Sequence, residues 1–278
     1  MPIYWKSIKS IPSLEILGHR VVWSVVFLMA IQIIRNRWDW IRTKLKDSKT
    51  RLTFIGTACV IGFNWFLCVW AVNSGYIVEA SLGYFINPLI SVFLGVLILR
   101  ERLRPIQWLA IIIAAVGVLY MTFAYGAFPW IALVLAFCFG FHGLMRKIGS
   151  LGALDGLTFE TGVLFLPSLL YLILLESKGV GTFAHASLQT TVLLSVTGIA
   201  TALPLLLFAS SVRRIPLSMA GILQYILPTM LFILGVFVYK EPFSTTRLIG
   251  FIFIWIAIIL FSADGFEIQR RKSVFIQL

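Results

Sequence analysis

Ionisable side chains stand inside the first long apolar stretch of this 278-residue chain. Glu15, His19 and Trp23 are spaced by four residues, so a helix would place them on one face, with Arg20 beside them. Arg20 follows Leu14 by six residues, and this carries it roughly 9 Å along a helix axis. A charge at that depth of a bilayer costs about 2.5–3.5 kcal/mol on insertion scales. We therefore expect Arg20 to face a cavity or a partner, where it could bind a polar solute.

A second polar stripe runs from Glu79 through Gly83 to Asn87 and ends beside Pro88. Proline frees a backbone carbonyl one turn earlier, which a membrane tolerates where the segment lines a cavity or meets other helices. Both helices are expected to start at the external side, so we predict that Glu79 pairs with Arg20 across a shared cavity in the outer half of the membrane. The alternative is that Glu79 occupies a first helical turn, where the helix dipole favours an acid. Glu79 is also the candidate carrier of a coupling proton.

Other polar residues in the apolar stretches have two interpretations each. Asn64, and Gln224 beside Tyr225, could contact a substrate or hold helices together through amide hydrogen bonds. His142 is expected to be a hydrogen-bonded interior histidine. Glu160 is expected in a first helical turn, stabilised by the dipole or exposed at the membrane interface.

Composition makes this an integral membrane protein. It is 60% hydrophobic and 12% charged, whereas a soluble domain keeps about 25% charged residues. A bilayer crossing takes roughly 20 apolar residues, and no polar stretch is long enough for a separate soluble domain. Nine apolar runs approach that length: 14–34, 52–72, 76–99, 105–124, 127–145, 157–175, 188–212, 215–239 and 248–263.

The net charge of +12 indicates an orientation rather than a nucleic-acid partner. Basic residues crowd every second loop, which is the positive-inside pattern. The pattern places loops 35–51, 100–104, 146–156 and 213–214 and the C-terminal tail in the cytoplasm, with their basic residues solvated. The three cysteines lie within apolar runs and are expected to pack rather than form a disulfide framework.

One segment occurs twice. Residues 80–101 align without a gap on residues 220–241, at an offset of 140, and both copies hold a central proline, Pro88 or Pro228, where we expect a helix kink. Both end in an acid, Glu101 or Glu241, expected to set helix ends or gate contacts. Five spans separate equivalent points, so the copies would enter the bilayer from opposite sides, as in alternating-access transporters. We predict one inverted repeat over 1–124 and the other over 125–278.

The first repeat lacks a span that matches 127–145. Met1 to Lys9 is expected to be the outer end of a helix, too short to cross a bilayer. We therefore expect the natural reading frame to extend upstream by about 20 apolar residues.

Several strings resemble the drug/metabolite transporter superfamily, EamA type, and within it the RarD group. They include "LEILGHRVVWS", "NWFLCVWAVNSG", "EASLGYFINPL" and "LQYILPTMLFILGVFVYKEPF". The resemblance implies ten helices in two inverted five-helix halves, and passage of a small molecule through a central cavity of a bacterial inner-membrane protein. It places a set of residues in the group's motifs: His19, Arg20, Asn64, Trp65, Asn73, Glu79, Tyr84 and Asn87.

The leading hypothesis is a secondary transporter that exports a small metabolite or drug, driven by an ion gradient such as protons. No G-x-x-x-x-G-K-[ST] motif is present, so the sequence gives no sign of an ATP-driven engine. An integral membrane enzyme is an alternative, but the three histidines lack metal-ligand spacing, and we predict no catalytic residue, metal or cofactor. A passive channel is the other alternative, and a homodimer is left open.

Overall fold

The protein is helical throughout the part described by the computed structural model, which covers residues 11–36, 38–238, 240 and 244–276, with side chains up to residue 264. Nine helical segments in this part are long and apolar enough to cross a membrane. No strand occurs among the described residues. The predicted all-α membrane fold with nine spans is confirmed. Met1 to Lys9 and Glu241 lie outside the described residues.

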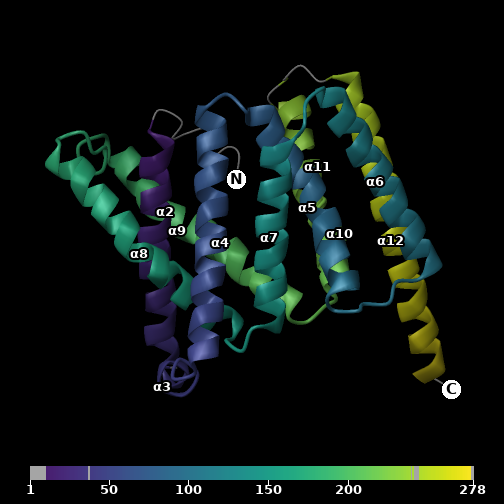
Figure 1. Ribbon diagram of the computed structural model, residues 1–278, viewed down its shortest axis with the longest axis horizontal. Helices are drawn as coiled ribbons and strands as arrows, with labels where there is room; N and C mark the ends of the chain where they lie inside the picture. The colour runs from purple at the N-terminus through teal and green to yellow at the C-terminus, as the bar shows by residue number, and fades with distance from the viewer. Residues whose placement is uncertain (1–10, 37, 239, 241–243, 277–278) are drawn as a thin grey trace. The chain divides into compact units, whose positions relative to one another are not determined.

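The helices follow one another with short connections (Figure 1). Seven are single spanning helices: α2 (Ser13–Arg35), α4 (Ser48–Asn73), α5 (Ile77–Leu97), α6 (Pro105–Tyr125), α7 (Trp130–Ile148), α8 (Ala153–Ser177) and α9 (Leu188–Val212). The eighth span is built from α10 (Leu217–Leu223), α11 (Ile226–Ile233) and the π-helix η1 (Leu234–Val238). The ninth is the first part of α12 (Thr245–Ile276), and the short helix α3 (Asp39–Thr43) lies between α2 and α4.

Local signals explain several helix ends. Asp47 caps α4 by accepting hydrogen bonds from the backbone N–H groups of Lys49 and Thr50. Pro105 opens α6, where its missing N–H costs nothing. Gly126 ends α6 in the left-handed conformation, with φ of 78°, which glycine adopts without a Cβ clash.

The chain folds into two compact units, and each consists of two separate segments. Unit 1 comprises residues 1–75 and 141–215, and unit 2 comprises residues 76–140 and 216–278. In both units the second segment begins 140 residues after the first, which is the offset of the sequence repeat. Each unit therefore combines equivalent parts of the two predicted repeats. The repeat boundary at residue 124 stays a prediction.

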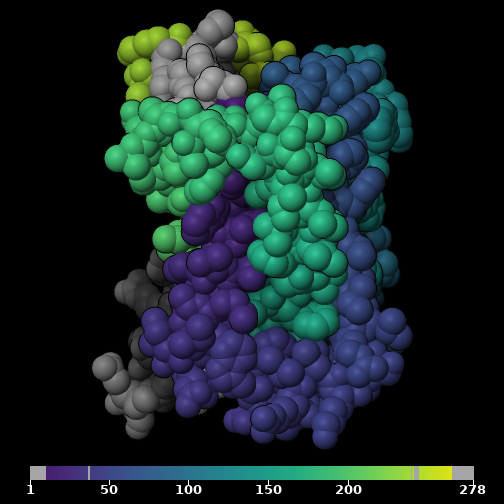
Figure 2. All heavy atoms as spheres, turned by 90° about the vertical axis from the view of Figure 1, so that its left-hand side faces the viewer, coloured from purple at the N-terminus to yellow at the C-terminus, as the bar shows by residue number. Residues whose placement is uncertain are grey.

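Unit 1 is organised around α2, which packs against α8 and α9, while α4 packs against α8. Figure 2 shows α2 in purple beside α8, with α3 at one end of this unit. Leu28, Leu157 and Ala202 meet in a buried cluster between these helices. The approach of α9 to α2 is close at Gly198, since a Cβ there would overlap the backbone of Trp23.

Unit 2 has one large apolar core. α12 lies along α6, and α5 packs against α10 and α6. The core joins residues from all of these helices, including Ile86, Ala114, Ile222 and Ile254.

The eighth span is interrupted at Gln224 and Tyr225, between α10 and α11. Pro228 explains the position of the break, because it lacks the N–H that would bond the Gln224 carbonyl one turn earlier. That carbonyl instead accepts a hydrogen bond from the Leu227 N–H at 3.0 Å. In the other copy, α5 continues through Pro88 as one helix.

Candidate functional site

The polar face of α2 is buried within unit 1. Glu15 is 1% exposed and accepts hydrogen bonds from the Thr182 N–H at 2.6 Å and the Thr182 hydroxyl at 2.9 Å. His19 lies 4.0 Å from the Glu15 carboxylate and stacks on Phe183, with ring centroids 4.9 Å apart. The loop between α8 and α9 therefore covers this face.

Arg20 and Trp23 lie beside that covered face. The Arg20 Nε donates to the Thr201 hydroxyl at 3.0 Å, and its guanidinium lies 5.3 Å from the Trp65 ring centroid, within cation–π range. The Trp23 ring is 5.9 Å from that of Phe183. Unit 1 thus holds Arg20 against an aromatic ring and a hydroxyl, a surface suited to polar or aromatic solutes.

The two asparagines of α4 differ in their surroundings. Asn64 is buried, whereas the exposed Asn73 accepts a hydrogen bond from the Ser13 hydroxyl at 3.1 Å. That bond ties the end of α4 to the start of α2.

Glu79 has partners within unit 2. Its carboxylate accepts from the Ile131 N–H at 2.7 Å and from the Tyr125 hydroxyl at 3.2 Å, so it connects α5 with the end of α6 and the start of α7. Arg20 belongs to unit 1 and Glu79 to unit 2, and their pairing stays a prediction.

A polar cluster marks the crossing of α5 with the eighth span. The Asn87 amide donates to the Gln224 side-chain carbonyl, and the Gln224 amide donates to the Ser91 hydroxyl at 3.4 Å. The fully buried Tyr225 donates its hydroxyl proton to the Phe85 carbonyl at 3.1 Å. Phe85 and Tyr225 are equivalent positions of the two repeat copies, 140 residues apart.

On one side of this crossing the two helices are in close contact. A Cβ on Gly221 would lie 2.8 Å from the Pro88 carbonyl oxygen and 2.9 Å from the Ser91 Cβ, and one on Gly95 would lie 3.1 Å from the Ser218 backbone nitrogen. We call this set the closed contact: Pro88, Ser91, Val92, Gly95, Ser218 and Gly221.

Glu101 completes the closed contact. Its carboxylate accepts hydrogen bonds from the Leu217 N–H at 2.6 Å, the Ser218 N–H at 2.9 Å and the Ser218 hydroxyl at 2.7 Å. The expectation that Glu101 sets a helix end is confirmed, because the two N–H groups open α10.

On the other side of the crossing, unit 2 contains a pocket of about 560 Å³, a size typical of small-molecule sites. Its lining comes from α5, α6, α11, η1 and the start of α12: Val78, Ser81, Leu82, Tyr84, Phe85, Met121, Ala124, Tyr125, Pro228, Leu231, Phe232, Gly235, Val236, Ser244, Thr246, Arg247 and Phe251.

The residues of the closed contact and residues of the pocket wall are equivalent positions of the two repeat copies. Pro88, Ser91, Val92 and Gly95 correspond to Pro228, Leu231, Phe232 and Gly235, and Ser218 and Gly221 correspond to Val78 and Ser81. All six counterparts line the pocket. The end of α5 meets the start of α10, while the start of α5 faces the pocket together with η1, so the two copies run antiparallel. The same helix pair is closed on one side and open on the other.

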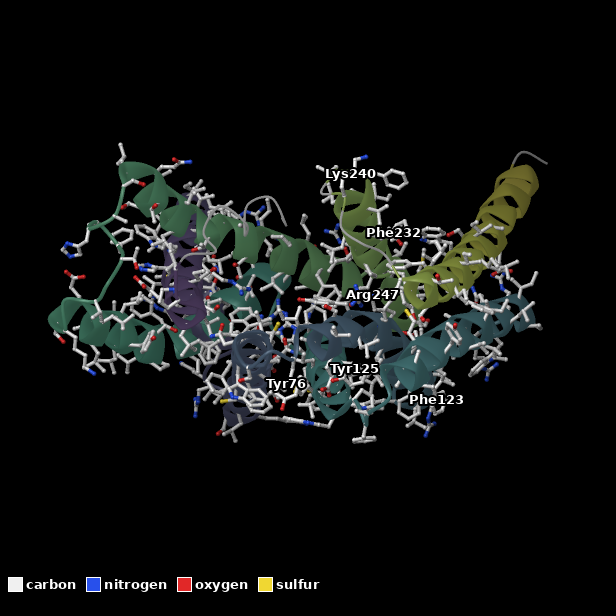
Figure 3. The ribbon with its side chains drawn as sticks, turned by 90° about the horizontal axis from the view of Figure 1, so that it is seen from above. Tyr76, Phe123, Tyr125, Phe232, Lys240 and Arg247 are labelled. Atoms are coloured by element: carbon white, nitrogen blue, oxygen red, sulfur yellow. The ribbon has the colours of Figure 1, made fainter. Side chains whose placement is uncertain are left out.

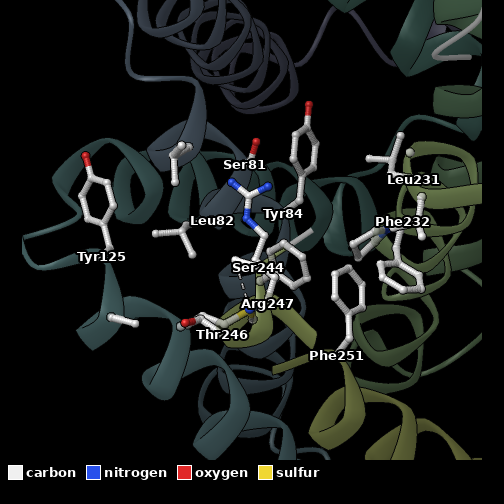
Figure 4. A pocket seen from close by; sticks show the side chains of 17 residues that line it. Ser81, Leu82, Tyr84, Tyr125, Leu231, Phe232, Ser244, Thr246, Arg247 and Phe251 are labelled. Carbon is white, nitrogen blue, oxygen red and sulfur yellow. Dashed lines mark hydrogen bonds between the residues drawn. The ribbon is translucent and has the colours of Figure 1, made fainter. Parts of the chain in front are cut away.

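Of the residues predicted for the substrate pathway, Tyr84 lines this pocket, and Pro228, predicted as a helix kink, lines it too. Sequence reasoning did not single out Arg247. Arg247 extends into the pocket between Leu82 and Tyr84 (Figure 4). Seen from above, it lies between Tyr125 and Phe232 (Figure 3). The 140-residue offset, applied to the residues of the closed contact, would have indicated the pocket side of the helix pair. The sequence alone does not show which residues form the closed contact.

Unit 1 also buries an ion cluster that the sequence did not predict. Arg146 and Glu160 are each 1% exposed, and a guanidinium nitrogen lies 3.6 Å from the carboxylate. The other carboxylate oxygen is 3.2 Å from the His142 Nε2. The expectation that Glu160 lies in a first helical turn, stabilised by the dipole or exposed at the interface, was wrong, because Glu160 is buried and lies beyond the first turn of α8. The solvated role expected for Arg146 was also wrong, whereas the prediction of a hydrogen-bonded interior His142 is confirmed.

Comparison with known proteins identifies the fold that carries this pocket. The model of the EamA-like transporter family matches residues 2–123 and again residues 128–263. This chain belongs to the EamA-like transporter family. Two relatives share 43% and 45% identity over 98% of this chain: "Protein RarD" of Streptomyces exfoliatus, covered over 86% of its length, and "Uncharacterized transporter YojE" of Bacillus subtilis, covered over 92%.

A solved structure titled "Crystal structure of protein" has the same fold as this EamA-like chain, with a TM-score of 0.71 and 15% identity over 94% of this chain and 92% of the other. Membership of the family makes the chain a multi-pass membrane protein of the transporter class, which acts on a small molecule within a lipid bilayer.

Proposed function

We propose that this chain is a secondary transporter that exports a small metabolite or drug by alternating access. The observation that supports this proposal is the exchange between the closed contact and the pocket. Six residues that close one side of the α5–α10 crossing have repeat counterparts that line a cavity on the other side. Inverted repeats change access by exchanging such contacts around a fixed site.

The alternate state follows from the same exchange. Ser81 would approach Leu231, as Gly221 now approaches Ser91, and the pocket would be closed. The closed contact would then open, and the Glu101 carboxylate would release the Leu217 and Ser218 N–H groups. The Arg20 and Trp65 surface of unit 1 supplies a second part of the substrate pathway in this proposal.

A disulfide tests the alternate state. The double variant Ser81→Cys and Leu231→Cys, in a background without Cys59, Cys68 and Cys138, should form a disulfide under mild oxidation only as the pocket closes. A disulfide requires Cβ atoms about 3.5–4.5 Å apart. The bond should abolish substrate flux, and reduction should restore it, whereas each single-cysteine variant should be insensitive to oxidant. Full flux with the disulfide formed would reject the exchange.

Flux in proteoliposomes separates the transporter from the alternatives. Substrates would first be found by a thermal-shift screen of metabolites and antibiotics on the purified protein. We expect accumulation against the substrate's own gradient when a proton gradient is imposed, and only equilibration without it. A passive channel would give equilibration in both cases, and an enzyme would change the compound chemically. The direction of the proton gradient that drives accumulation shows whether the substrate moves with the proton or against it.

Glu79 is the proposed carrier of the coupling proton. It is buried beside the pocket, and its carboxylate contacts Tyr125, a lining residue. Glu79→Gln should retain passive exchange of substrate but lose accumulation under a proton gradient. Unchanged accumulation would remove Glu79 from the coupling step.

A further inference from the structure

The described lining of the pocket in unit 2 carries a single charge, and it is positive. Among the seventeen described residues that line the pocket, Arg247 is the one charged side chain, and none of these seventeen is Asp or Glu. Glu79, in the first turn of α5, directs its carboxylate to the Ile131 N–H and the Tyr125 hydroxyl. Within the described part of the lining, no acid therefore offsets the charge of Arg247.

Helix ends add to this positive field. Val78 and Ser81 place the first turns of α5 in the pocket wall, and Ser244 and Thr246 do the same for the start of α12. The N-terminus of each helix carries a partial positive charge. The Arg247 guanidinium therefore lies in a region where two long helices begin.

The opposite side of the crossing shows which ligand this geometry accepts. There the Glu101 carboxylate binds the backbone N–H groups of Leu217 and Ser218. The repeat counterparts of those two residues are Ile77 and Val78, in the first turn of α5. On the closed side, the Glu101 carboxylate therefore occupies the position that corresponds, in the pocket, to the space beside the first turn of α5.

The remaining wall is aromatic. The rings of Phe232 and Phe251 are tilted by 41° to each other, with centroids 4.8 Å apart, and Tyr84, Phe85 and Tyr125 also line the pocket. Aromatic surfaces of this kind bury flat apolar bodies, while a guanidinium binds carboxylates with two parallel hydrogen bonds.

We infer that the pocket selects organic anions: small molecules with a flat apolar body and a carboxylate, with the carboxylate at Arg247 and the start of α5 and the body against Phe232 and Phe251. This inference rests on the proposed function, because it names the substrate class of the same pocket.

The test uses the charge of thiol reagents and does not require a known substrate. Ser81→Cys, in the background without native cysteines, places one thiol in the pocket wall. Purified protein is treated with two methanethiosulfonate reagents of similar size, the anionic sulfonatoethyl and the cationic trimethylammonioethyl compound. The quantity compared is the ratio of the reaction rate of the anionic reagent to that of the cationic one. We expect this ratio to be several-fold higher at Ser81→Cys than at Ala186→Cys, an exposed site between α8 and α9.

Arg247→Gln should remove this preference at Ser81→Cys, and Arg247→Lys should retain most of it. Arg214→Gln, at an exposed arginine of unit 1, should leave it unchanged. Reaction of Ser81→Cys with both reagents at the ratio of the Ala186→Cys control would overturn anion selection and leave the transport proposal intact. Failure of Ser81→Cys to react with either reagent would instead show that the pocket is closed, which contradicts the state on which the proposed function rests.

A matched pair of ligands extends the test to binding. Indole-3-propionate and tryptamine share an aromatic ring and differ in the sign of their charge. The anion should bind at least several-fold more tightly by calorimetry, and Arg247→Gln should remove that difference. Equal affinity, or preference for the amine, would overturn the inference.

Discussion

Arg146 is the largest side chain that is completely buried in the described core. Its guanidinium donates to the Gly152 and Ala153 carbonyls at the start of α8 and lies against the Glu160 carboxylate. Arg213 donates to the carbonyls of Arg146, Gly149 and Leu151, so a second cation fastens the same connection. A buried charge of this kind persists only when it is paired and hydrogen-bonded. The cluster therefore fixes the α7–α8 connection.

Glu160→Gln should be strongly destabilising, because it leaves the Arg146 charge buried without its partner. We expect a loss of about 3–5 kcal/mol in the free energy of unfolding, measured by denaturant titration in detergent. The matched control is Glu176→Gln, whose pair with His185 at 2.6 Å is more than half exposed; exposed pairs contribute about 0–1 kcal/mol. Equal unfolding midpoints for the two variants would contradict the role assigned to the cluster.

Asp47 gives a pH dependence with a defined sign. Hydrogen bonds from the Thr50 side chain and backbone lower the pKa of this carboxyl below its ordinary value. Because the folded pKa is the lower one, capping of α4 is fully present above the unfolded value of about 3.9 and is lost as the pH falls through the folded pKa. Hydrogen exchange of the Lys49 and Thr50 amides, corrected for intrinsic rates, should show protection at pH 6 that disappears at the lowest pH.

Asp47→Asn provides the control for this titration, since asparagine also caps helices but does not ionise. Protection of the two amides should then be independent of pH. A pH dependence that persists in Asp47→Asn would assign the effect to another group.

At the level of elements, the sequence predicted what depends on apolar length alone. All nine runs became helices of spanning length, because the backbone in a bilayer must satisfy its own hydrogen bonds. The division of the eighth span at Gln224 could not be predicted in the same way. Pro88, the repeat counterpart of Pro228, lies inside the continuous helix α5. Whether a helix breaks at this proline therefore depends on tertiary contacts. Arg146 was misjudged for a related reason, since position at the end of an apolar run does not reveal what the next loop covers.

The close contact between α9 and α2 in unit 1 requires a small residue at Gly198. Gly198→Ala would press a methyl group into the backbone of Trp23 and Ser24, and overpacking of this kind costs about 1–3 kcal/mol. The α2–α9 contact should therefore weaken, with a lower unfolding midpoint in detergent.

Gly162→Ala on α8 is the matched substitution, because a Cβ there meets nothing within 4 Å. It should be neutral or stabilising by up to about 1 kcal/mol, since alanine is the better helix former. A larger loss at Gly162 than at Gly198 would refute close packing as the reason for glycine at Gly198.

At the level of the whole molecule, the offset of 140 residues was visible in the sequence, and it reappears in the segments of both units. The pocket itself was not predictable, because its residues come together only when α5, α6, α11, η1 and α12 are packed. Arg247 was not recognised as a lining residue, because an arginine beside a loop is ordinarily exposed to solvent. Membrane orientation remains a separate prediction that rests on the basic loops.

Orientation can be tested with single cysteines. Thr43→Cys and Ser244→Cys, each in the background without native cysteines, should lie on opposite sides of the membrane if loop 35–51 is cytoplasmic. An impermeant maleimide added to intact cells should label Ser244→Cys and leave Thr43→Cys unlabelled until the cells are opened. Labelling of both from outside would reject the inverted topology and the cytoplasmic C-terminus inferred with it.

The hydrogen bond from Tyr225 to Phe85 joins two equivalent positions of the repeat. Two points that a two-fold operation exchanges lie on opposite sides of its axis, so exchanged points that are in contact lie next to the axis, where a rotation displaces them least. The bond should therefore survive in both states and act as the pivot about which the flanking helices rock. Tyr225→Phe would then leave substrate affinity nearly unchanged on either side while altering how fast the two sides exchange, a purely kinetic phenotype at a residue far from solvent.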